Sequence, residues 1–197
     1  MKTWIAEIKT SLLATAALAI LLCGVYPLAV SLAGRGLFPG RADGSLLVRG
    51  GQVVGSSLIG RSFEGPRYFH SRPSAAGAGY DGAASGGTNL GPLSKALSEA
   101  VFRRAAEYRA ENGLPAGTLI PADAVTSSAS GLDPHISPAN AGMQAARVAR
   151  ARGLEESFVR ARVMAFTQGR DLGVLGEPRV NVLLLNLDLD GKGNAGR

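Results

Sequence analysis

An uncharged stretch of about 23 residues, Ser11–Ala33, constrains this chain more than any other feature. The hydrocarbon core of a bilayer is about 30 Å thick, so an α-helix needs about 20 apolar residues to cross it. A helix is expected because a lone segment in lipid must satisfy every backbone N–H and C=O internally. The stretch therefore predicts a transmembrane anchor at residues 11–33, behind a short flank at residues 1–10.

A cleaved signal peptide is the alternative interpretation of the same stretch. The apolar region of a signal peptide covers about 7–15 residues, and Ser31-Leu32-Ala33 resembles a cleavage site. The stretch is longer than such a region, which favours a retained anchor. The flanking charges leave the orientation open, because lysines precede the span, arginines follow it, and long domains are translocated largely regardless of charge.

The rest of the chain suits one soluble domain. Residues 34–44 are interpreted as a linker, and residues 45–197 are long enough to bury a hydrophobic core. Cys23 is the only cysteine and lies in the span, so the fold has to hold without an intrachain disulfide. The net charge of +6 is spread along the chain without a basic cluster, which argues against nucleic-acid binding. Membrane lipid is the expected partner of the apolar anchor.

Local patterns predict an α+β domain with a small sheet and about three helices. Gly50 and Gly51 separate two apolar runs and predict a β-hairpin. Residues 71–92 have few side chains able to build a core and predict a long ordered loop. The run 179–190 (RVNVLLLNLDLD) has strong β character and predicts a central strand. The expected helices cover residues 92–112, residues 137–153 and a third segment that ends at Gly169.

Catalytic and metal-binding motifs are missing from the sequence. It contains no G-x-x-x-x-G-K-[ST], no G-x-S-x-G and no H-E-x-x-H. His70 and His135 are the only histidines and the soluble domain has no cysteine, so neither a metal site nor a catalytic residue is assigned. An acid–base pair of His135 with Asp133 is one hypothesis, and a structural role at a turn is favoured because Asp-Pro is typical of turns.

A glycine-rich loop precedes the first predicted helix of the domain. Converging backbone N–H groups and a helix N-terminus favour an anion, so the loop is a candidate for contact with a nucleotide phosphate. A turn that needs positive φ is the alternative interpretation. The candidate nucleotide-linked residues of this loop are Ser85, Gly86, Gly87, Thr88 and Asn89.

Further along the chain, Glu177 and Arg179 are expected to form a surface ion pair that contributes little to stability.

Five segments, in fixed order over nearly the whole chain, carry a family resemblance. They are SLIG (57–60), YFHSRPSA (68–75), SGGTNLGP (85–92), VTSSASGLDPHISP (125–138) and GEPRVNVL (176–183). Together with the single span they resemble the C subunit of the bacterial Kdp-type potassium-transporting ATPase. The polar motif positions whose role is left open are Arg72, Ser74, Asp133, His135, Glu177 and Arg179.

The resemblance implies a non-catalytic accessory subunit of an ATP-driven, high-affinity potassium uptake pump. Its partners would be a channel-like potassium-binding subunit, a P-type ATPase subunit and a small membrane subunit in the bacterial inner membrane. The family is regarded as a catalytic chaperone that raises the ATP affinity of the ATPase subunit, so no firmly bound cofactor is expected and ATP would be reached through the complex. The family also implies an extracytoplasmic soluble domain, which could stabilise the assembly instead.

Two other functions remain as alternatives. A membrane-anchored sensor or scaffold domain would need no ATPase partner. A hydrolase would use Ser85 or Ser130 with His135 and an aspartate, although the nucleophile elbow is missing. The absence of a D-K-T-G phosphorylation motif shows that the chain is not itself the energy-converting subunit of a P-type pump.

Overall fold

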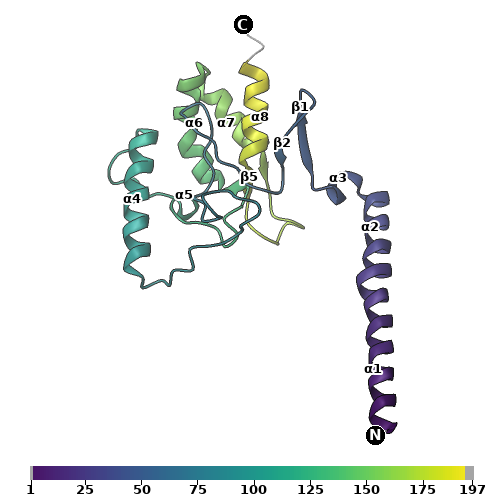
Figure 1. Cartoon of the computed structure of the whole chain (residues 1–197). Helices are drawn as coiled ribbons and strands as arrows, with labels where there is room; N and C mark the ends of the chain where they lie inside the picture. Colours follow the sequence, from purple (N-terminus) through teal and green to yellow (C-terminus); the bar gives the residue numbers. More distant parts are fainter. Residues whose placement is uncertain (1, 194–197) are drawn as a thin grey trace. The chain divides into compact units, whose positions relative to one another are not determined.

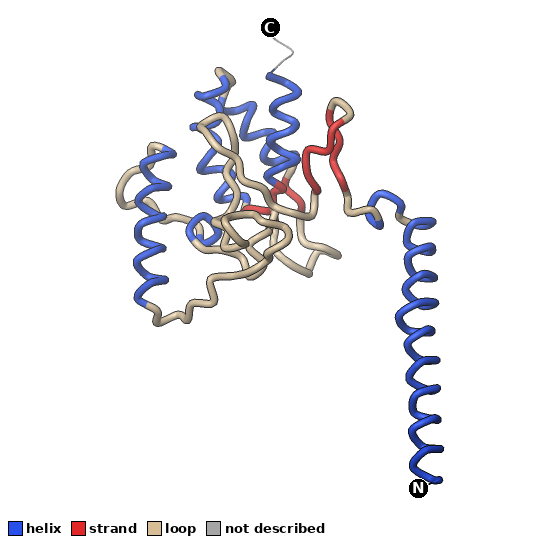
Figure 2. Tube along the Cα trace, viewed as in Figure 1, coloured by secondary structure: helices blue, strands red, loops and turns tan. Residues whose placement is uncertain are grey.

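The computed structural model describes residues 2–193 and divides into two compact units, with the boundary between Leu46 and Leu47. Figure 1 shows the order of the elements and Figure 2 their classes. The first unit is almost entirely helical, and the second mixes helices with short strands. The chain is therefore of the α+β class, with one N-terminal candidate span and one soluble domain, as the sequence predicts.

The N-terminal unit consists of one long helical segment and one short helix. Helix α1 (Lys2–Ala19) runs through a π-helical stretch (Ile20–Val25) into α2 (Tyr26–Leu37), and α3 (Pro39–Ala42) follows. The stretch from Thr3 to Leu37 is the one described helix that is long and apolar enough to cross a bilayer, and none of its most apolar window is buried within the chain. The helix is longer than the predicted span, because it includes residues on both sides of 11–33.

The π-helical stretch has a local cause. Pro27 follows it in the first turn of α2, and a proline ring clashes with the carbonyl four residues earlier and donates no hydrogen bond. A wider turn with i→i+5 hydrogen bonds accommodates the missing donor without ending the helix. The helix thus continues past Pro27 through a π-bulge.

The soluble domain begins with the predicted β-hairpin. Strands β1 (Leu46–Arg49) and β2 (Gln52–Ser56) form a two-stranded sheet. The turn residues Gly50 and Gly51 have φ values of 59° and 79°, as a two-residue hairpin turn requires. From residue 57 to residue 94 the structure contains turns and extended chain but no helix or strand, in agreement with the predicted long loop.

Helix α4 (Lys95–Asn112) starts three residues later than predicted. Ser94 is its N-cap and accepts a hydrogen bond from Leu97 N–H at 3.4 Å, so Pro92 lies outside the helix. At its other end Gly113 adopts a left-handed φ of 64°. A single turn, α5 (Ala122–Val125), follows after a loop.

Helices α6 (Pro138–Arg152) and α7 (Glu156–Ala165) pack against each other. The predicted caps of α6 are confirmed: the Ser137 hydroxyl accepts from Asn140 N–H at 3.1 Å, and Gly153 closes the helix with a φ of 67°. Helix α7 ends at Ala165, earlier than the predicted Gly169, because the chain turns into a short strand.

The domain's second sheet has three short strands. They are β3 (His135–Ile136), β4 (Thr167–Gln168) and β5 (Arg179–Asn181), with β5 in the centre and antiparallel to both neighbours. The central position of β5 is as predicted. His135 pairs with Asn181 and Ile136 with Val180 on one side, and Thr167 pairs with Val180 on the other.

The prediction of a strand as far as Asp190 is wrong. After Asn181 the chain forms helix α8 (Val182–Gly193). The Asn181 side chain accepts a hydrogen bond from Leu184 N–H at 3.1 Å, as a helix N-cap does. Val182, Leu185 and Leu189 then lie at helical spacing and are all buried. Helix α8 and the single turn α5 are additional to the three helices that the sequence predicts.

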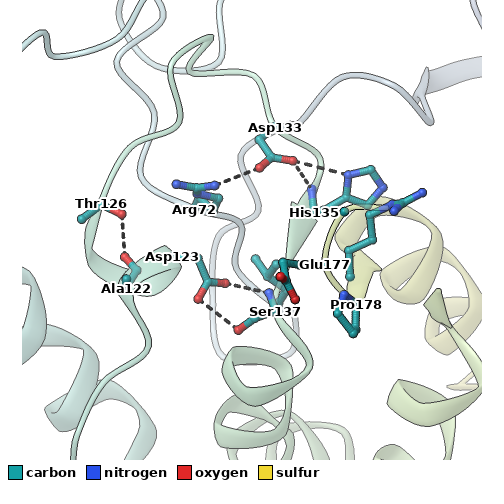
Figure 3. A pocket seen from close by; sticks show the side chains of 12 residues that line it. Arg72, Ala122, Asp123, Thr126, Asp133, His135, Ser137, Glu177 and Pro178 are labelled. Carbon is teal, nitrogen blue, oxygen red and sulfur yellow. Dashed lines mark hydrogen bonds and ion pairs between the residues drawn. The ribbon is translucent and has the colours of Figure 1, made fainter. Parts of the chain in front are cut away.

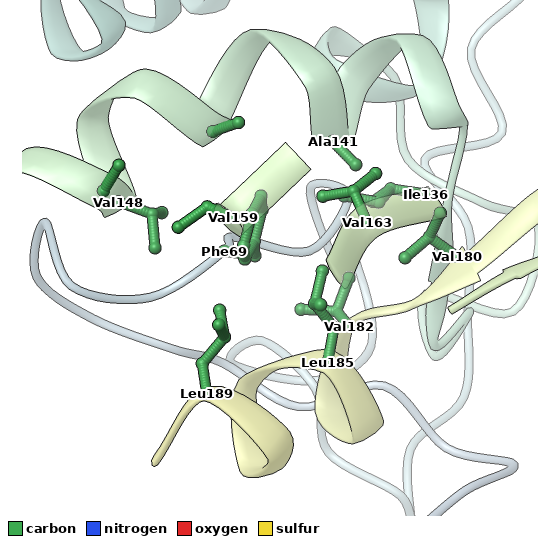
Figure 4. Packing of buried hydrophobic residues seen from close by; sticks show 12 residues of the cluster. Phe69, Ile136, Ala141, Val148, Val159, Val163, Val180, Val182, Leu185 and Leu189 are labelled. Carbon is green, nitrogen blue, oxygen red and sulfur yellow. The ribbon is translucent and has the colours of Figure 1, made fainter. Parts of the chain in front are cut away.

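The hydrophobic core lies between α6, α7, α8 and the three-stranded sheet (Figure 4). Phe69 from the long loop is fully buried among these elements, which fixes the loop to the domain. The other members are Ile136, Ala141, Ala145, Val148, Ala149, Val159, Val163, Val180, Val182, Leu185 and Leu189. Small and β-branched residues dominate the cluster, so the helices approach one another closely.

Candidate functional site

A cavity of about 600 Å³ collects most of the polar motif positions (Figure 3). It lies where the long loop, α5, β3, the N-terminus of α6 and the segment before β5 meet. Five of the six open motif positions line it: Arg72, Asp133, His135, Glu177 and Arg179. Because they come from three segments distant in sequence, the fold rather than local spacing brings them together.

Asp133 links two of these segments. Its Oδ2 accepts a hydrogen bond from Arg72 Nη1 at 3.0 Å, and its Oδ1 accepts one from the His135 backbone N–H at 3.0 Å. The His135 ring nitrogen Nδ1 also lies 3.4 Å from Oδ1. Partial burial alone would raise the pKa of Asp133, but the bonds from His135 and the charge of Arg72 outweigh burial and hold the pKa below its usual range.

This geometry places Asp133 and His135 in a turn. A carboxylate that accepts the N–H two residues on closes an Asx-turn, and Pro134 stands between the two residues. The same carboxylate holds Arg72, whose Nη2 also donates to the Ser127 carbonyl at 3.4 Å. The pair therefore fixes the loop that leads into β3.

Asp123 is a member of the cavity that sequence reasoning missed. Its Oδ2 accepts from Ser137 N–H at 2.7 Å and from Asn140 Nδ2 at 3.0 Å, and its Oδ1 accepts from Ser137 Oγ at 3.0 Å. The carboxylate thus occupies the positive N-terminal end of α6. Asp123 lies 14 residues before Ser137, so no local pattern marks this role.

The predicted ion pair between Glu177 and Arg179 is wrong. Glu177 binds Arg170 at 2.8 Å, and Arg179 binds Asp171 at 3.2 Å. The two residues stand on either side of Pro178, just before and at the start of β5, and each binds a residue of the chain segment that follows β4.

Ser74 does not line this cavity and instead holds the long loop. Its hydroxyl donates to the Gly131 carbonyl at 2.7 Å and accepts from Tyr80 N–H at 2.8 Å and Ala76 N–H at 3.2 Å. The sixth motif position is therefore a structural hydroxyl in a tight turn.

The glycine-rich candidate loop is docked on residues 128–131. Gly86 N–H and Ser85 Oγ both donate to the Ser130 carbonyl, at 2.9 Å and 3.0 Å. A Cβ on Gly87 would lie 2.9 Å from the Ala129 carbonyl oxygen, so Gly87 permits a close approach of two backbones rather than a positive φ. The loop is also separated from the first residue of α4 by Leu90–Ser94. The phosphate contact of Ser85–Asn89 stays a prediction.

The serines named for a hydrolase have other partners. The Ser130 hydroxyl accepts from Leu132 N–H at 3.1 Å, and the Ser85 hydroxyl is bound to the Ser130 carbonyl. Within residues 2–193 the structure gives neither hydroxyl a bond to His135, and no group of three or more His, Cys, Asp or Glu side chains is arranged to hold a metal ion. The polar side chains that line the cavity therefore join loops to one another and to the start of α6.

Comparison with known proteins places this chain in a family. Residues 8–191 match the family model described as the c chain of K⁺-transporting ATPase, KdpC. The chain belongs to the KdpC family. It is therefore a subunit of a K⁺-transporting ATPase complex, which is membrane-bound and includes further Kdp subunits.

The KdpC relatives span almost the same length as this chain. A potassium-transporting ATPase KdpC subunit of Nitratidesulfovibrio vulgaris is 55% identical over 93% of this chain and 93% of the relative. The KdpC subunit of Koribacter versatilis is 52% identical over 92% and 93%. That of Myxococcus xanthus is 57% identical over 90% of this chain and 85% of the relative. Both the helix and the soluble domain thus lie within the family's range.

Proposed function

We propose that this chain is a non-catalytic subunit that anchors itself in the inner membrane and holds the other subunits of a potassium uptake pump together. The partners are a channel-like potassium-binding subunit, a P-type ATPase subunit and a small membrane subunit. The soluble domain stands on the extracytoplasmic side. Assembly, rather than chemistry, is its contribution.

The N-terminal helix carries this proposal. Its apolar window has no buried residues within the described chain, so its side chains are available to lipid and to the spans of other subunits. Within a bilayer, helices associate through close packing at small residues, and Ala14, Ala17 and Gly24 occur in this helix. A Cβ on Gly24 would meet no atom of the chain within 4 Å, so nothing in the chain itself requires a glycine there.

The polar cavity supports a role without catalysis. Asp123 caps α6, Asp133 joins Arg72 to the turn before β3, and Glu177 and Arg179 are paired within the neighbouring hairpin. Groups used in this way give the domain a defined shape. A defined extracytoplasmic shape is what a subunit needs in order to clamp its neighbours.

The ATP-affinity role that the resemblance implies would act through the assembled pump. Ser85 and Gly86 are already bonded to the Ser130 carbonyl, so direct phosphate binding by that loop requires it to leave residues 128–131. A conformational effect passed through subunit contacts requires no such opening. We therefore propose that any effect of this chain on the ATP affinity of the ATPase subunit requires the assembled pump.

Potassium-stimulated ATPase activity tests the proposal. The complex is purified from membranes that express the partner subunits with this chain, without it, or with it restored from a second plasmid. Activity and co-purification that depend on the chain, at an unchanged apparent KM for ATP, support assembly alone. An apparent KM that rises without the chain supports the ATP-affinity role. Equal activity and assembly with and without the chain contradict the proposal and favour a sensor or scaffold domain.

A further inference from the structure

Three arginines that are far apart in sequence meet around one carboxylate of α8. Arg49 at the end of β1 lies 3.6 Å from Asp190 Oδ2, and Arg152 at the end of α6 lies 3.0 Å from Asp190 Oδ1. Arg67 from the long loop lines a cavity of about 420 Å³ together with Arg49, Tyr68 and Asp190. This arginine cluster, Arg49, Arg67 and Arg152 with Asp190, holds three cations and one anion and is therefore positively charged.

Arg152 is the buried member of the arginine cluster. Its side chain is 1% exposed, its Nε donates to the Arg67 carbonyl at 2.6 Å, and its guanidinium lies 5.2 Å from the centre of the Tyr68 ring. Its Nη1 is buried and has no hydrogen-bond partner within residues 2–193. Because little water screens a buried guanidinium, Arg152 raises the positive potential of the cavity beside it.

Arg49 and Arg67 are the members that a ligand can reach. The Arg67 backbone is fixed through its carbonyl, whereas among the described residues the structure shows no hydrogen bond or ion pair of the exposed Arg67 guanidinium. Arg49 shares Asp190 with Arg152 and keeps 43% of its side chain exposed. A guanidinium binds a phosphate group through two parallel N–H donors. The two arginines are therefore suited to hold an oxyanion.

A second cavity, of about 450 Å³, adjoins the first, because Arg49, Tyr68 and Asp190 line both. The residues that it adds include four apolar side chains and one pair of opposite charges: Val54, Phe63, Leu183 and Leu187, with Arg61 and Glu64. The added charges cancel, so the excess of positive charge stays with the arginine cluster. A cationic cavity joined to a partly apolar one is suited to an anion that carries a hydrocarbon portion.

We propose that the arginine cluster binds the phosphate group of an anionic phospholipid. The phosphate lies against Arg49 and Arg67, and the glycerol and upper acyl region lie against the apolar side chains of the second cavity. Negatively charged membrane surfaces attract basic side chains. Arg49 comes twelve residues after Leu37, the last residue of α2, and this length of chain spans at most about 40 Å. The domain of an anchored chain is thus held within reach of lipid.

Two other occupants share part of this chemistry. Inorganic phosphate offers the same oxyanion without a hydrocarbon portion, and an acidic side chain of another pump subunit offers a carboxylate. The apolar side chains Val54 and Phe63 favour the lipid, because burial of its hydrocarbon adds to the charge contact. Binding by the purified chain alone separates the three and does not depend on the proposed assembly function.

The first experiment compares three ligands on the full chain in an uncharged detergent. Dihexanoyl-phosphatidylglycerol, dihexanoyl-phosphatidylcholine and inorganic phosphate are titrated separately, and the melting temperature of the chain is recorded. A ligand that binds the folded chain raises this temperature by mass action. We expect the anionic lipid to reach its half-maximal effect at a lower concentration than the zwitterionic lipid, which has the same acyl chains, or inorganic phosphate.

Substitutions locate the binding. Arg67→Gln should raise the half-maximal concentration of the anionic lipid about tenfold, because a charge-assisted contact with phosphate is lost. Without ligand this variant should melt like the wild type, since Arg152 binds the carbonyl of residue 67 and not its side chain. The matched control is Arg103→Gln, which removes one exposed positive charge from α4 and should leave binding unchanged. Val54→Thr should weaken lipid binding about threefold and leave phosphate binding unchanged.

The outcomes decide between the occupants. Weaker lipid binding in Arg67→Gln but not in Arg103→Gln supports the inference. Equal binding of inorganic phosphate, unaffected by Val54→Thr, assigns the cluster to a free oxyanion and overturns the lipid occupant. Equal losses in the two arginine variants reject the site, because net charge alone would explain them. If no ligand binds but Arg67→Gln lowers the amount of co-purified pump subunits, the cluster contacts a subunit and the inference fails, while the assembly function stands.

Discussion

At the scale of single residues, Asp133 joins two segments that line the cavity. One carboxylate binds Arg72 from the long loop and closes the turn that leads through Pro134 to His135 and β3. Its pKa is lower in the folded chain than the ordinary value of 3.8, so folding favours the charged form. The contribution of this carboxylate to stability is therefore complete at pH values above 3.8 and is lost as the pH falls through the lower folded pKa.

Replacement of Asp133 by asparagine should reveal this linkage. We expect Asp133→Asn to lower the free energy of unfolding by about 2 kcal/mol at neutral pH, because hydrogen bonds to a charged group are lost beside Arg72. Below pH 3.8 the difference between wild type and variant should shrink. Thermal unfolding of the purified chain in detergent across this range measures both effects.

The control for this prediction is Glu99→Gln. Glu99 is an exposed carboxylate on α4 that pairs with Lys95 of the same helix, so its replacement should change little at any pH. A difference between wild type and Asp133→Asn that stays constant down to strongly acidic pH would contradict the assignment of the charge effect to Asp133.

At the scale of elements, two amide side chains attach the long loop to the helices. Asn186 on α8 accepts from Phe69 N–H and donates to the Phe69 carbonyl, both at 2.9 Å. Gln144 on α6 does the same for His70, at 2.7 Å and 3.1 Å. Each amide replaces a neighbouring strand, so two successive residues of an irregular segment have their backbone groups satisfied inside the domain.

Loss of one amide should therefore destabilise the domain strongly. We expect Asn186→Ala to cost about 2–3 kcal/mol, because Asn186 is fully buried and its loss leaves the Phe69 N–H and carbonyl without partners. Chemical denaturation of the purified chain gives this value. Gln168→Ala, at an exposed position of β4, is the comparison and should cost much less. Similar costs for the two variants would disprove the role of the amide.

Elements with short-range signals were predictable from the sequence. The Gly50-Gly51 turn and the caps Ser137 and Gly153 determine structure within a few residues, and the hairpin and α6 confirm them. The run after Asn181 carries both a strand pattern and a helix pattern. Burial of Val182, Leu185 and Leu189 against α6 and α7 decides in favour of the helix, and that packing is absent from the local sequence.

The candidate site divides in the same way. The contact of Asp133 with His135 spans two residues and was predictable. The contact of Arg72 with Asp133 spans 61 residues, and the cap by Asp123 spans 14, so both depend on the finished fold. The family resemblance pointed to most of the cavity residues but not to their contacts. Glu177 and Arg179 are neighbours in sequence, yet they do not pair with each other, because Glu177 binds Arg170 and Arg179 binds Asp171 across the hairpin.

At the scale of the whole molecule, the single candidate span makes topology a binary question. One crossing of the bilayer puts the N-terminal end and the soluble domain on opposite sides. Lysines before the span and arginines after it give no consistent positive-inside signal, and a domain of this length is translocated largely regardless of charge. The extracytoplasmic position proposed for the domain therefore has to be measured.

Cysteine labelling decides the side of the membrane. In a Cys23→Ser background, Leu119→Cys places one exposed thiol on the soluble domain, and Thr3→Cys places one at the other end of the helix. In spheroplasts, an impermeant maleimide should label Leu119→Cys at once and Thr3→Cys only after lysis, because the bilayer separates the reagent from the cytoplasm. The reverse pattern would put the domain in the cytoplasm, where ATP is abundant. It would then favour nucleotide contact by Ser85–Asn89 over the proposed assembly role. Equal labelling of both thiols before lysis would mean that the chain does not span the membrane.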